Sequence, residues 1–174
     1  MEQYYNPGLE VLGDHWLKLH RNENLFIEKE WLVEISKSVA SSLNLSQYPD
    51  PNCSRLKNRL GQIYNIDSDR IFVGNGSDEI LADLLHYLRS SFTEVVTAPI
   101  TYRVYPLLFQ RYGYTHLTLE KASKERLCLI DSPNSLTGEI ATVFDIPSSF
   151  LIWDNVYGEF ANDQINLKQL DSST

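Results

Sequence analysis

The chain has 174 residues, of which 43% are hydrophobic and 22% charged, so it is long enough for one sizeable globular core. Its formal net charge of -8 argues against a nucleic-acid or anionic-membrane surface, because both partners need clustered Lys and Arg. The two cysteines, Cys53 and Cys128, have no disulfide or zinc spacing, and the histidines have no metal-ligand spacing, so no metal is expected.

The N-terminus carries neither the pattern of a secretory signal nor a segment long enough to span a membrane. A cytoplasmic protein is therefore expected. Residues 1–26 lack clear periodicity and predict an extended N-terminal arm. Over residues 27–43 the apolar side chains recur every four residues, which predicts an amphipathic helix. These side chains are Ile27, Trp31, Ile35 and Val39.

The run Tyr48-Pro49-Asp50-Pro51 predicts an extended turn, because a residue before a proline is pushed out of the α region. A second helix is expected over residues 53–65, and a short strand over residues 70–73. That strand runs directly into Gly74-Asn75-Gly76-Ser77-Asp78-Glu79, where a third helix begins. Glycines permit close backbone approach and helix-start N–H groups attract anions, so this turn is the best phosphate-binding candidate. An ordinary tight turn with a helix cap is the alternative.

Strands alternate with a helix along the rest of the chain. The strands are predicted over residues 94–98, 115–119, 127–130 and 150–153, and the helix over residues 101–112. This alternation indicates the α/β class, with a mostly parallel sheet and helices on both faces. The near-continuous apolar character of the strands fits a sheet buried on both sides.

Polar and aromatic residues follow these strands at the edge where doubly wound sheets bind ligands. Tyr102 could stack on a planar ring, or could be an ordinary half-buried tyrosine. The loop 131–138 could be only a turn-rich connection. Asp154 ends an apolar strand, with Tyr157 three residues later. A planar cofactor with a phosphate tail and a ring nitrogen that needs a carboxylate would use these three loops together with the glycine turn at residues 74–79. Pyridoxal phosphate is a cofactor of this kind.

At these residues the sequence resembles a fold-type I pyridoxal-phosphate aminotransferase, most closely the histidinol-phosphate aminotransferase branch. The similarity runs over about residues 17–160 and covers only the N-terminal half of such an enzyme. The resemblance implies that residues 27–174 form a partial cofactor-binding large domain of the aspartate aminotransferase type, without the small C-terminal domain. It also implies pyridoxal 5'-phosphate as the cofactor.

The resemblance assigns a role to each motif. The glycine turn matches the family's phosphate-binding turn, which places Ser77, Asp78 and Glu79 at the phosphate. Tyr102 falls on the aromatic residue that stacks on the ring. Asp154 takes the position that bonds the pyridine nitrogen, and Tyr157 the position that donates to the phenolic oxygen.

Two further motifs carry expectations about the substrate and the assembly. Arg21-Asn22-Glu23-Asn24 is similar to the family's Asn-Glu-Asn arm, so Asn24 is expected to bind substrate. Tyr48-Pro49-Asp50 resembles the segment whose tyrosine reaches the cofactor phosphate of the neighbouring subunit. A homodimer is therefore expected, with Tyr48 acting in trans.

The sequence departs from the family at two places. Ser135 stands where an asparagine normally bonds the phenolic oxygen, with Leu136 in place of a proline. Loss of a good donor to a charged oxygen costs roughly 1.5 to 3 kcal/mol. The Schiff-base lysine of the family follows the aspartate by more residues than remain here, and Lys168 comes too early, so no catalytic residue is assigned.

Three functions remain open on the sequence. The first is a histidinol-phosphate-type aminotransferase, which moves an amino group between a phosphorylated amino alcohol or amino acid and 2-oxoglutarate; without the lysine, this chain alone is expected to be inactive. The second is an inactive remnant or split half that acts as a binding or assembly module. The third is an unrelated phosphate-ligand or nucleotide-binding domain, which leaves Tyr102, Asp154 and Tyr157 unexplained.

Overall fold

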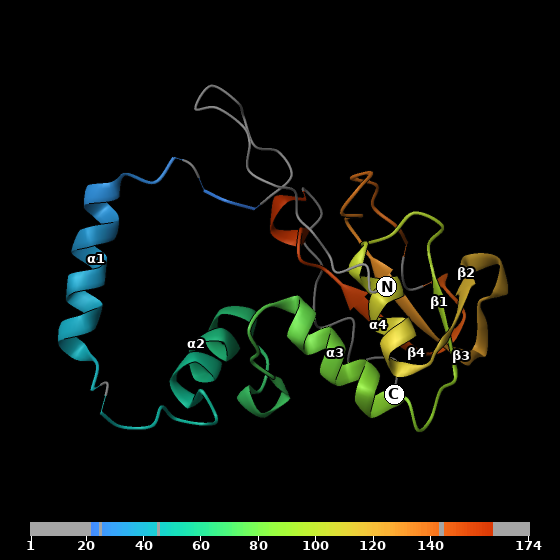
Figure 1. The fold of residues 1–174 in the computed structure, drawn as a ribbon, viewed down its shortest axis with the longest axis horizontal. Coiled ribbons are helices and arrows are strands. Elements are labelled where there is room, and N and C mark those ends of the chain that lie inside the picture. The colour runs from blue at the N-terminus through green and yellow to red at the C-terminus, as the bar shows by residue number, and fades with distance from the viewer. Residues whose placement is uncertain (1–21, 25, 45, 143–144, 162–174) are drawn as a thin grey trace. The chain divides into compact units, whose positions relative to one another are not determined.

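The computed structural model describes residues 22–24, 26–44, 46–142 and 145–161. The chain divides into two compact units, Met1–Ser54 and Arg55–Thr174, which are taken separately here (Figure 1). Most of the predicted N-terminal arm lies outside the described residues. No helix within the described ranges combines the length and the apolar character that crossing a membrane requires.

The first unit contains one described helix, α1 (Lys29–Ser42), which confirms the helix predicted over residues 27–43. Glu30 lies in its first turn, where a negative charge complements the helix dipole. None of its residues is buried; the predicted apolar stripe is exposed, with Trp31 at 52% and Val39 at 47%. The stripe therefore forms, but it does not contribute to a core in this unit.

The predicted turn before the second helix is held by Asp50. Its Oδ1 accepts a hydrogen bond from Asn52 N at 2.9 Å, and its Oδ2 accepts one from Ser54 N at 2.7 Å. A carboxylate that satisfies the first N–H groups of a helix is a typical cap. The helix that follows, α2 (Ser54–Tyr64), confirms the helix predicted over residues 53–65.

The strand predicted over residues 70–73 is wrong. Asp67 caps a single 3-10 turn, η1 (Ser68–Arg70), and the chain then runs extended from Ile71 without pairing with any strand of the described sheet. The apolar run looks like a buried strand, yet Phe72 is 67% exposed. An extended segment becomes a strand only where a neighbour supplies backbone hydrogen bonds, and no described neighbour does so here.

The remaining predicted strands form one parallel sheet. They are β1 (Glu94–Thr97), β2 (Thr115–Thr118), β3 (Ser123–Asp131) and β4 (Ser148–Asp154). Their order in space is β2-β1-β3-β4, and every neighbouring pair is parallel. The α/β fold class is thereby confirmed.

Two helices, α3 (Ser77–Leu88) and α4 (Val104–Tyr112), pack on the same face of this sheet (Figure 1), so the predicted helices on both faces are not seen among the described residues. The core between them and the sheet is made of Leu81, Leu85, Leu88, Val95, Val104, Tyr105, Leu108, Phe109, Tyr114, Leu127, Leu129 and Ile152. Fully burying one such side chain contributes roughly 1.5 to 3 kcal/mol. The alternating residues Val96, Cys128 and Ile130 are also buried, which explains the near-continuous apolar strands.

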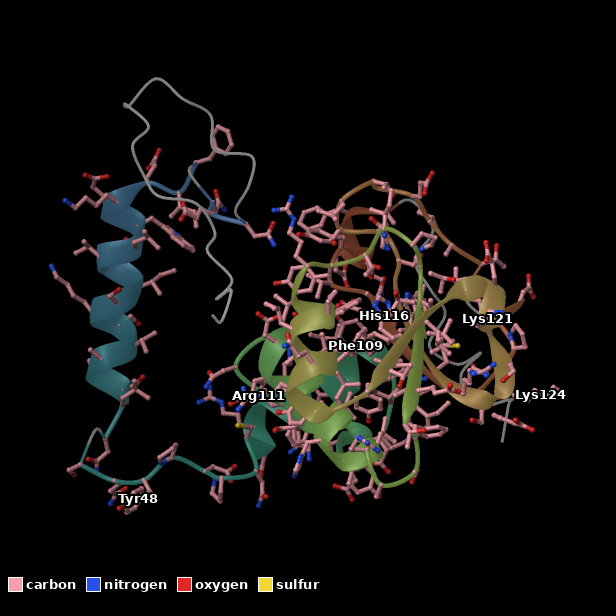
Figure 2. The ribbon with its side chains drawn as sticks, turned by 45° about the vertical axis from the view of Figure 1, so that its right-hand side comes forward. Tyr48, Phe109, Arg111, His116, Lys121 and Lys124 are labelled. Carbon is pink, nitrogen blue, oxygen red and sulfur yellow. The ribbon has the colours of Figure 1, made fainter. Side chains whose placement is uncertain are left out.

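The outer strand β2 is joined to the core through aromatic and polar contacts. Phe109 and His116 lie side by side, with their ring centroids 5.1 Å apart (Figure 2). The Nε2 of His116 is 2.7 Å from Oγ1 of Thr97, a buried residue of β1. Burial lowers the pKa of His116, so the neutral ring is favoured at this position.

Candidate functional site

The order of the strands creates a ligand-binding edge between β1 and β3. From β1 the chain goes to β2 on one side, and then returns to β3 on the other side. The loops that follow β1 and β3 therefore leave the sheet in different directions, and open α/β sheets bind ligands in the crevice at such a switch point. The predicted candidates Tyr102 and Ser135 follow β1 and β3, and Asp154 is the last residue of β4, the neighbour of β3.

The two loops at the switch point are joined by Asp131, the last residue of β3. Its Oδ1 accepts from Oγ1 of Thr101 at 2.9 Å and from Nδ2 of Asn134 at 3.3 Å. Its Oδ2 accepts from the backbone N and from Oγ of Ser135, at 3.1 and 3.0 Å. Asp131 is only 4% exposed, so this carboxylate exchanges hydration for a full set of protein donors.

Asn134 holds the loop after β3 in shape. Its Oδ1 accepts from the backbone N of Leu136 and of Thr137, both at 2.9 Å. Its Nδ2 donates to the carbonyl oxygen of Ile100 at 2.8 Å, which ties the loop to the one after β1. At the start of the same loop, Nε1 of Trp153 donates to the carbonyl oxygen of Ser132 at 2.9 Å. These bonds fix residues 132–138 although they form no helix or strand.

Asp154, at the end of β4, lies beside the buried ring of Tyr105. The Tyr105 hydroxyl donates to Oδ2 of Asp154 at 2.7 Å, and the backbone N of Val156 donates to Oδ1 at 3.3 Å. Burial raises the pKa of Asp154 most, and the charges of Asp131 and Asp78 raise it further, while the bond from Tyr105 lowers it. Burial and the nearby Asp154 also raise the pKa of Tyr105.

Tyr102 and the start of α3 are linked to Asp154 indirectly, Tyr102 through the ring of Tyr105 and α3 through the charge of Asp78. The rings of Tyr102 and Tyr105 meet edge to face, with centroids 5.6 Å apart and an interplanar angle of 86°. The charge of Asp78 contributes to the pKa shift of Asp154, so the first turn of α3 lies within electrostatic range of it. The structure thus brings together three separate sequence candidates, Tyr102, Asp78 and Asp154.

The glycine turn before α3 has the geometry that an anion site requires. Gly76 is the N-cap with φ 83° and ψ 174°, a backbone conformation open essentially only to glycine. It offers no side chain to the first N–H groups of the helix, which start at Ser77. The Glu79 carboxylate instead accepts from the backbone N of Asn75. Glu79 therefore stabilises the turn through a hydrogen bond to its backbone.

A cavity of about 420 Å³ lies beside the loop after β3 and the start of η4 (Gly158–Phe160). It is lined by Pro133, Asn134, Ser135, Gly138, Ile140, Tyr157, Phe160 and Ala161. Ser135 and Tyr157, both predicted at the phenolic oxygen of a cofactor, therefore share one cavity. A second cavity, of about 570 Å³, is bordered by Ile100, Ile130 and Ile140 among others.

Two predicted site residues belong to the first unit. Tyr48 is fully exposed in the turn before α2. Asn24 is exposed as well, and its Oδ1 accepts a hydrogen bond from Phe26 N at 3.1 Å. The predicted roles of Tyr48 in trans and of Asn24 at the substrate stay predictions.

Sequence reasoning missed Thr101, Tyr105, Asp131 and Asn134. Tyr105 is spaced like any core residue of α4, so its hydroxyl bond to Asp154 has no local signal. Asp131 follows a buried apolar strand as Asp154 does. The position at the end of a buried strand could therefore have identified Asp131 as a candidate, as it did Asp154.

Comparison with known proteins identifies relatives of the chain. A histidinol-phosphate aminotransferase from Methylococcus capsulatus is 29% identical over 178 residues, which cover 91% of this chain and 49% of that protein. One from Clostridium acetobutylicum is 39% identical over 101 residues, covering 58% of this chain and 28% of that protein. The chain is a homologue of histidinol-phosphate aminotransferases. No model of a protein family matches it.

The chain spans about half the length of the histidinol-phosphate aminotransferases it matches, which is consistent with the predicted resemblance to an N-terminal half. The crystal structure of a histidinol-phosphate aminotransferase from Sinorhizobium meliloti, in complex with pyridoxal-5'-phosphate, superposes with a TM-score of 0.63. It is 19% identical and covers 79% of this chain and 43% of that chain. The predicted aminotransferase fold is therefore confirmed.

Proposed function

We propose that the second unit supplies part of the pyridoxal-phosphate site of a histidinol-phosphate-type aminotransferase. The observation that carries this proposal is the convergence of Asp154, Tyr102 and the first turn of α3 at the strand ends around the switch point. The homology of the chain supports the same cofactor. When bound, pyridoxal phosphate supplies a ring that accepts electrons from the substrate carbon.

Asp154 fits the ring nitrogen of this cofactor. Its carboxylate is half-buried and receives neutral donors from Tyr105 and Val156. The one ion pair between side chains of the described residues joins Arg126 to Glu94, away from Asp154. A protonated ring nitrogen would be a cationic partner, which offsets the cost of burying the charge. The carboxylate would in turn keep the ring nitrogen protonated.

The first turn of α3 fits the phosphate. Backbone N–H groups at a helix start, with no side chain capping them, present the donors and the dipole end that an anion prefers. Ser77 adds a hydroxyl, while the Glu79 carboxylate is engaged with Asn75. Of the three residues predicted at the phosphate, we therefore propose Ser77 and the backbone of Asp78 as the direct contacts. Glu79 would act through the shape of the turn.

The remaining groups fit the ring. Tyr102 offers an aromatic face to the ring, held edge to face on Tyr105. Tyr157 lines the cavity of about 420 Å³ from η4, where a phenolic donor would meet the ring oxygen. None of the described residues that line these two cavities is a lysine, so the residues named here would hold the cofactor by hydrogen bonds and stacking.

The proposals on substrates and assembly are supported by the homology alone. We propose a phosphorylated amino alcohol or amino acid as amino donor and 2-oxoglutarate as acceptor, with Asn24 near the substrate. We also propose a homodimer in which Tyr48 reaches the phosphate bound by the neighbouring subunit. These roles are typical of the enzymes that the sequence resembles.

The test is binding of pyridoxamine 5'-phosphate to the 174-residue chain, measured by isothermal titration calorimetry. This form of the cofactor has no aldehyde, so it cannot react with surface lysines. We expect Asp154→Asn to weaken binding at least tenfold, about 1.4 kcal/mol. The matched control is Asp83→Asn, which removes an exposed carboxylate from α3. Equal affinity of Asp154→Asn and the unmodified chain would rule out the proposed role.

A further inference from the structure

We propose that Asp131 is a positioning residue that takes the hydroxyl hydrogen of Ser135. Ser135 then anchors the loop after β3 and does not donate to the phenolic oxygen of the cofactor. The part that concerns the cofactor rests on the proposed function. The part that concerns the two side chains rests on their geometry alone.

The geometry around Asp131 suits an ionised carboxylate. Four hydrogens point at its two oxygens: those of Thr101 Oγ1 and Asn134 Nδ2 at Oδ1, and those of Ser135 N and Ser135 Oγ at Oδ2. A protonated carboxyl group would place a hydrogen of its own against one of these donors. Bonds from neutral donors to a charged acceptor are stronger than neutral pairs, so this arrangement is favoured in a residue only 4% exposed.

The hydroxyl of Ser135 has one hydrogen to give. Its Oγ lies 3.0 Å from Oδ2 of Asp131, which is acceptor-only when ionised, so the hydrogen lies between them. Toward the cavity the same Oγ presents lone pairs. A phenolic oxygen that carries negative charge needs hydrogen-bond donors, and a lone pair is not a donor. Ser135 at this position therefore cannot replace the amide donor expected there.

The fold gives Asp131 a reason to hold this loop. The residue is paired with Asp154 across β3 and β4, so it stands one strand away from the proposed nitrogen partner. Through Thr101 it also reaches the loop that carries Tyr102. Asp131 thus connects the loop that borders the ring oxygen with the loop that presents the stacking tyrosine.

The first experiment follows the ionisation of the phenolic oxygen. The absorption spectrum of bound pyridoxamine 5'-phosphate is titrated with pH in the unmodified chain and in Ser135→Ala. A lost donor would favour the protonated oxygen and raise the titration midpoint. We expect Ser135→Ala to leave the midpoint unchanged. A rise of about one pH unit, a tenfold change in proton affinity, would overturn the proposal.

The same titration tests Asp131 directly. Asp131→Asn removes the charge that holds the Ser135 hydroxyl. We expect the midpoint to fall, both because a negative charge near the phenolic oxygen is lost and because the hydroxyl can turn to that oxygen. The double variant Asp131→Asn/Ser135→Ala keeps the first contribution and loses the second, so its midpoint should lie between those of Asp131→Asn and the unmodified chain. A midpoint that does not fall in Asp131→Asn, or an equal fall in the double variant, would contradict the assignment. A residue with only a structural role would not produce this pattern.

A second experiment needs no cofactor. In urea unfolding, we expect Asp131→Asn and Ser135→Ala each to lower the midpoint, and the double variant to lower it by less than the sum, because the two side chains share one bond. Thr137→Ala is the matched control: it removes a hydroxyl from the same loop that bonds to Glu139 instead, and its effect should add to that of Asp131→Asn. Additive effects of Asp131→Asn and Ser135→Ala would overturn the proposed link between these two side chains. A failure of pyridoxamine 5'-phosphate to bind would refute only the proposed function, and this unfolding test would still apply.

Discussion

Asp131 and Asp154 are paired across β3 and β4, yet their carboxylates are satisfied in opposite ways. Asp131 receives hydrogen bonds from Thr101, Asn134 and Ser135, and its carboxylate is closed off. Asp154 receives one bond to each oxygen, from Tyr105 and Val156, and its pKa is raised by burial. Two acids with the same place in the sequence pattern therefore differ in surroundings: Asp131 accepts four hydrogen bonds from the loops, and Asp154 accepts two.

The raised pKa of Asp154 makes stability depend on pH. Its pKa in the folded chain lies above the ordinary value of 3.8, so the folded state binds the proton more tightly than the unfolded state. The stabilisation is fully present below pH 3.8 and is lost as pH rises through the folded-state pKa. We expect Asp154→Asn to raise the free energy of unfolding at pH 7 without ligand, with a smaller gain near pH 4. Urea unfolding at both pH values measures this. A loss of stability at pH 7 would contradict it.

The bond between Tyr105 and Asp154 has a measurable strength. Tyr105→Phe keeps the buried ring and removes only the donor, so a half-buried carboxylate loses one of its two bonds. We expect a cost of roughly 1.5 to 3 kcal/mol at neutral pH, the range for hydrogen bonds to charged groups. Tyr87→Phe, at a tyrosine that is 78% exposed, is the control and should change stability by less than about 0.5 kcal/mol.

Leu85 tests the core that α3 and α4 form on the sheet. It is 0% exposed, and its carbonyl oxygen accepts the Tyr114 hydroxyl at 2.7 Å. Leu85→Ala is expected to lower the free energy of unfolding by about 2 to 5 kcal/mol, through lost burial and the cavity left behind. Leu56→Ala, at a leucine of α2 that is 49% exposed, should cost clearly less. Chemical unfolding of the two variants side by side decides the matter; similar losses would place Leu85 outside the core.

Gly76 tests the turn before α3. A Cβ at this position would meet nothing within 4 Å, so the only penalty for alanine is its backbone conformation at φ +83°. We expect Gly76→Ala to cost roughly 1 to 3 kcal/mol of stability. Gly76→Ala should also weaken the binding of pyridoxamine 5'-phosphate, because the first N–H groups of α3 would be displaced. Ser90→Ala, at an exposed serine just after α3, controls for both measurements.

Much of the fold could be predicted from the sequence because its signals are local. The four-residue repeat of apolar side chains predicts the helix α1, and the apolar runs predict the strands β1 and β4. The strand expected at residues 70–73 failed because pairing depends on a neighbour that the local sequence does not specify. The N-terminal half of β3, at Ser123–Arg126, was missed because it is polar and its exposed positions carry no apolar signal.

The candidate site was predictable only in part, for a related reason. Asp154 and Tyr102 stand at the ends of predicted elements, so their sheet edge could be inferred. One partner of Asp131, Thr101, lies 30 residues away in the sequence. Which loops meet at the switch point depends on the order β2-β1-β3-β4, and that order is set by packing over the whole sheet.

The hydrogen bond from Nε1 of Trp153 to the carbonyl oxygen of Ser132 has a practical consequence. An indole that is anchored at the start of the loop after β3 is an intrinsic fluorophore beside the candidate site. The chain has two other tryptophans, Trp16 and Trp31, and replacing both with phenylalanine would leave Trp153 as the single emitter. Ligand entry and movement of the loop could then be followed in real time, without attaching a dye.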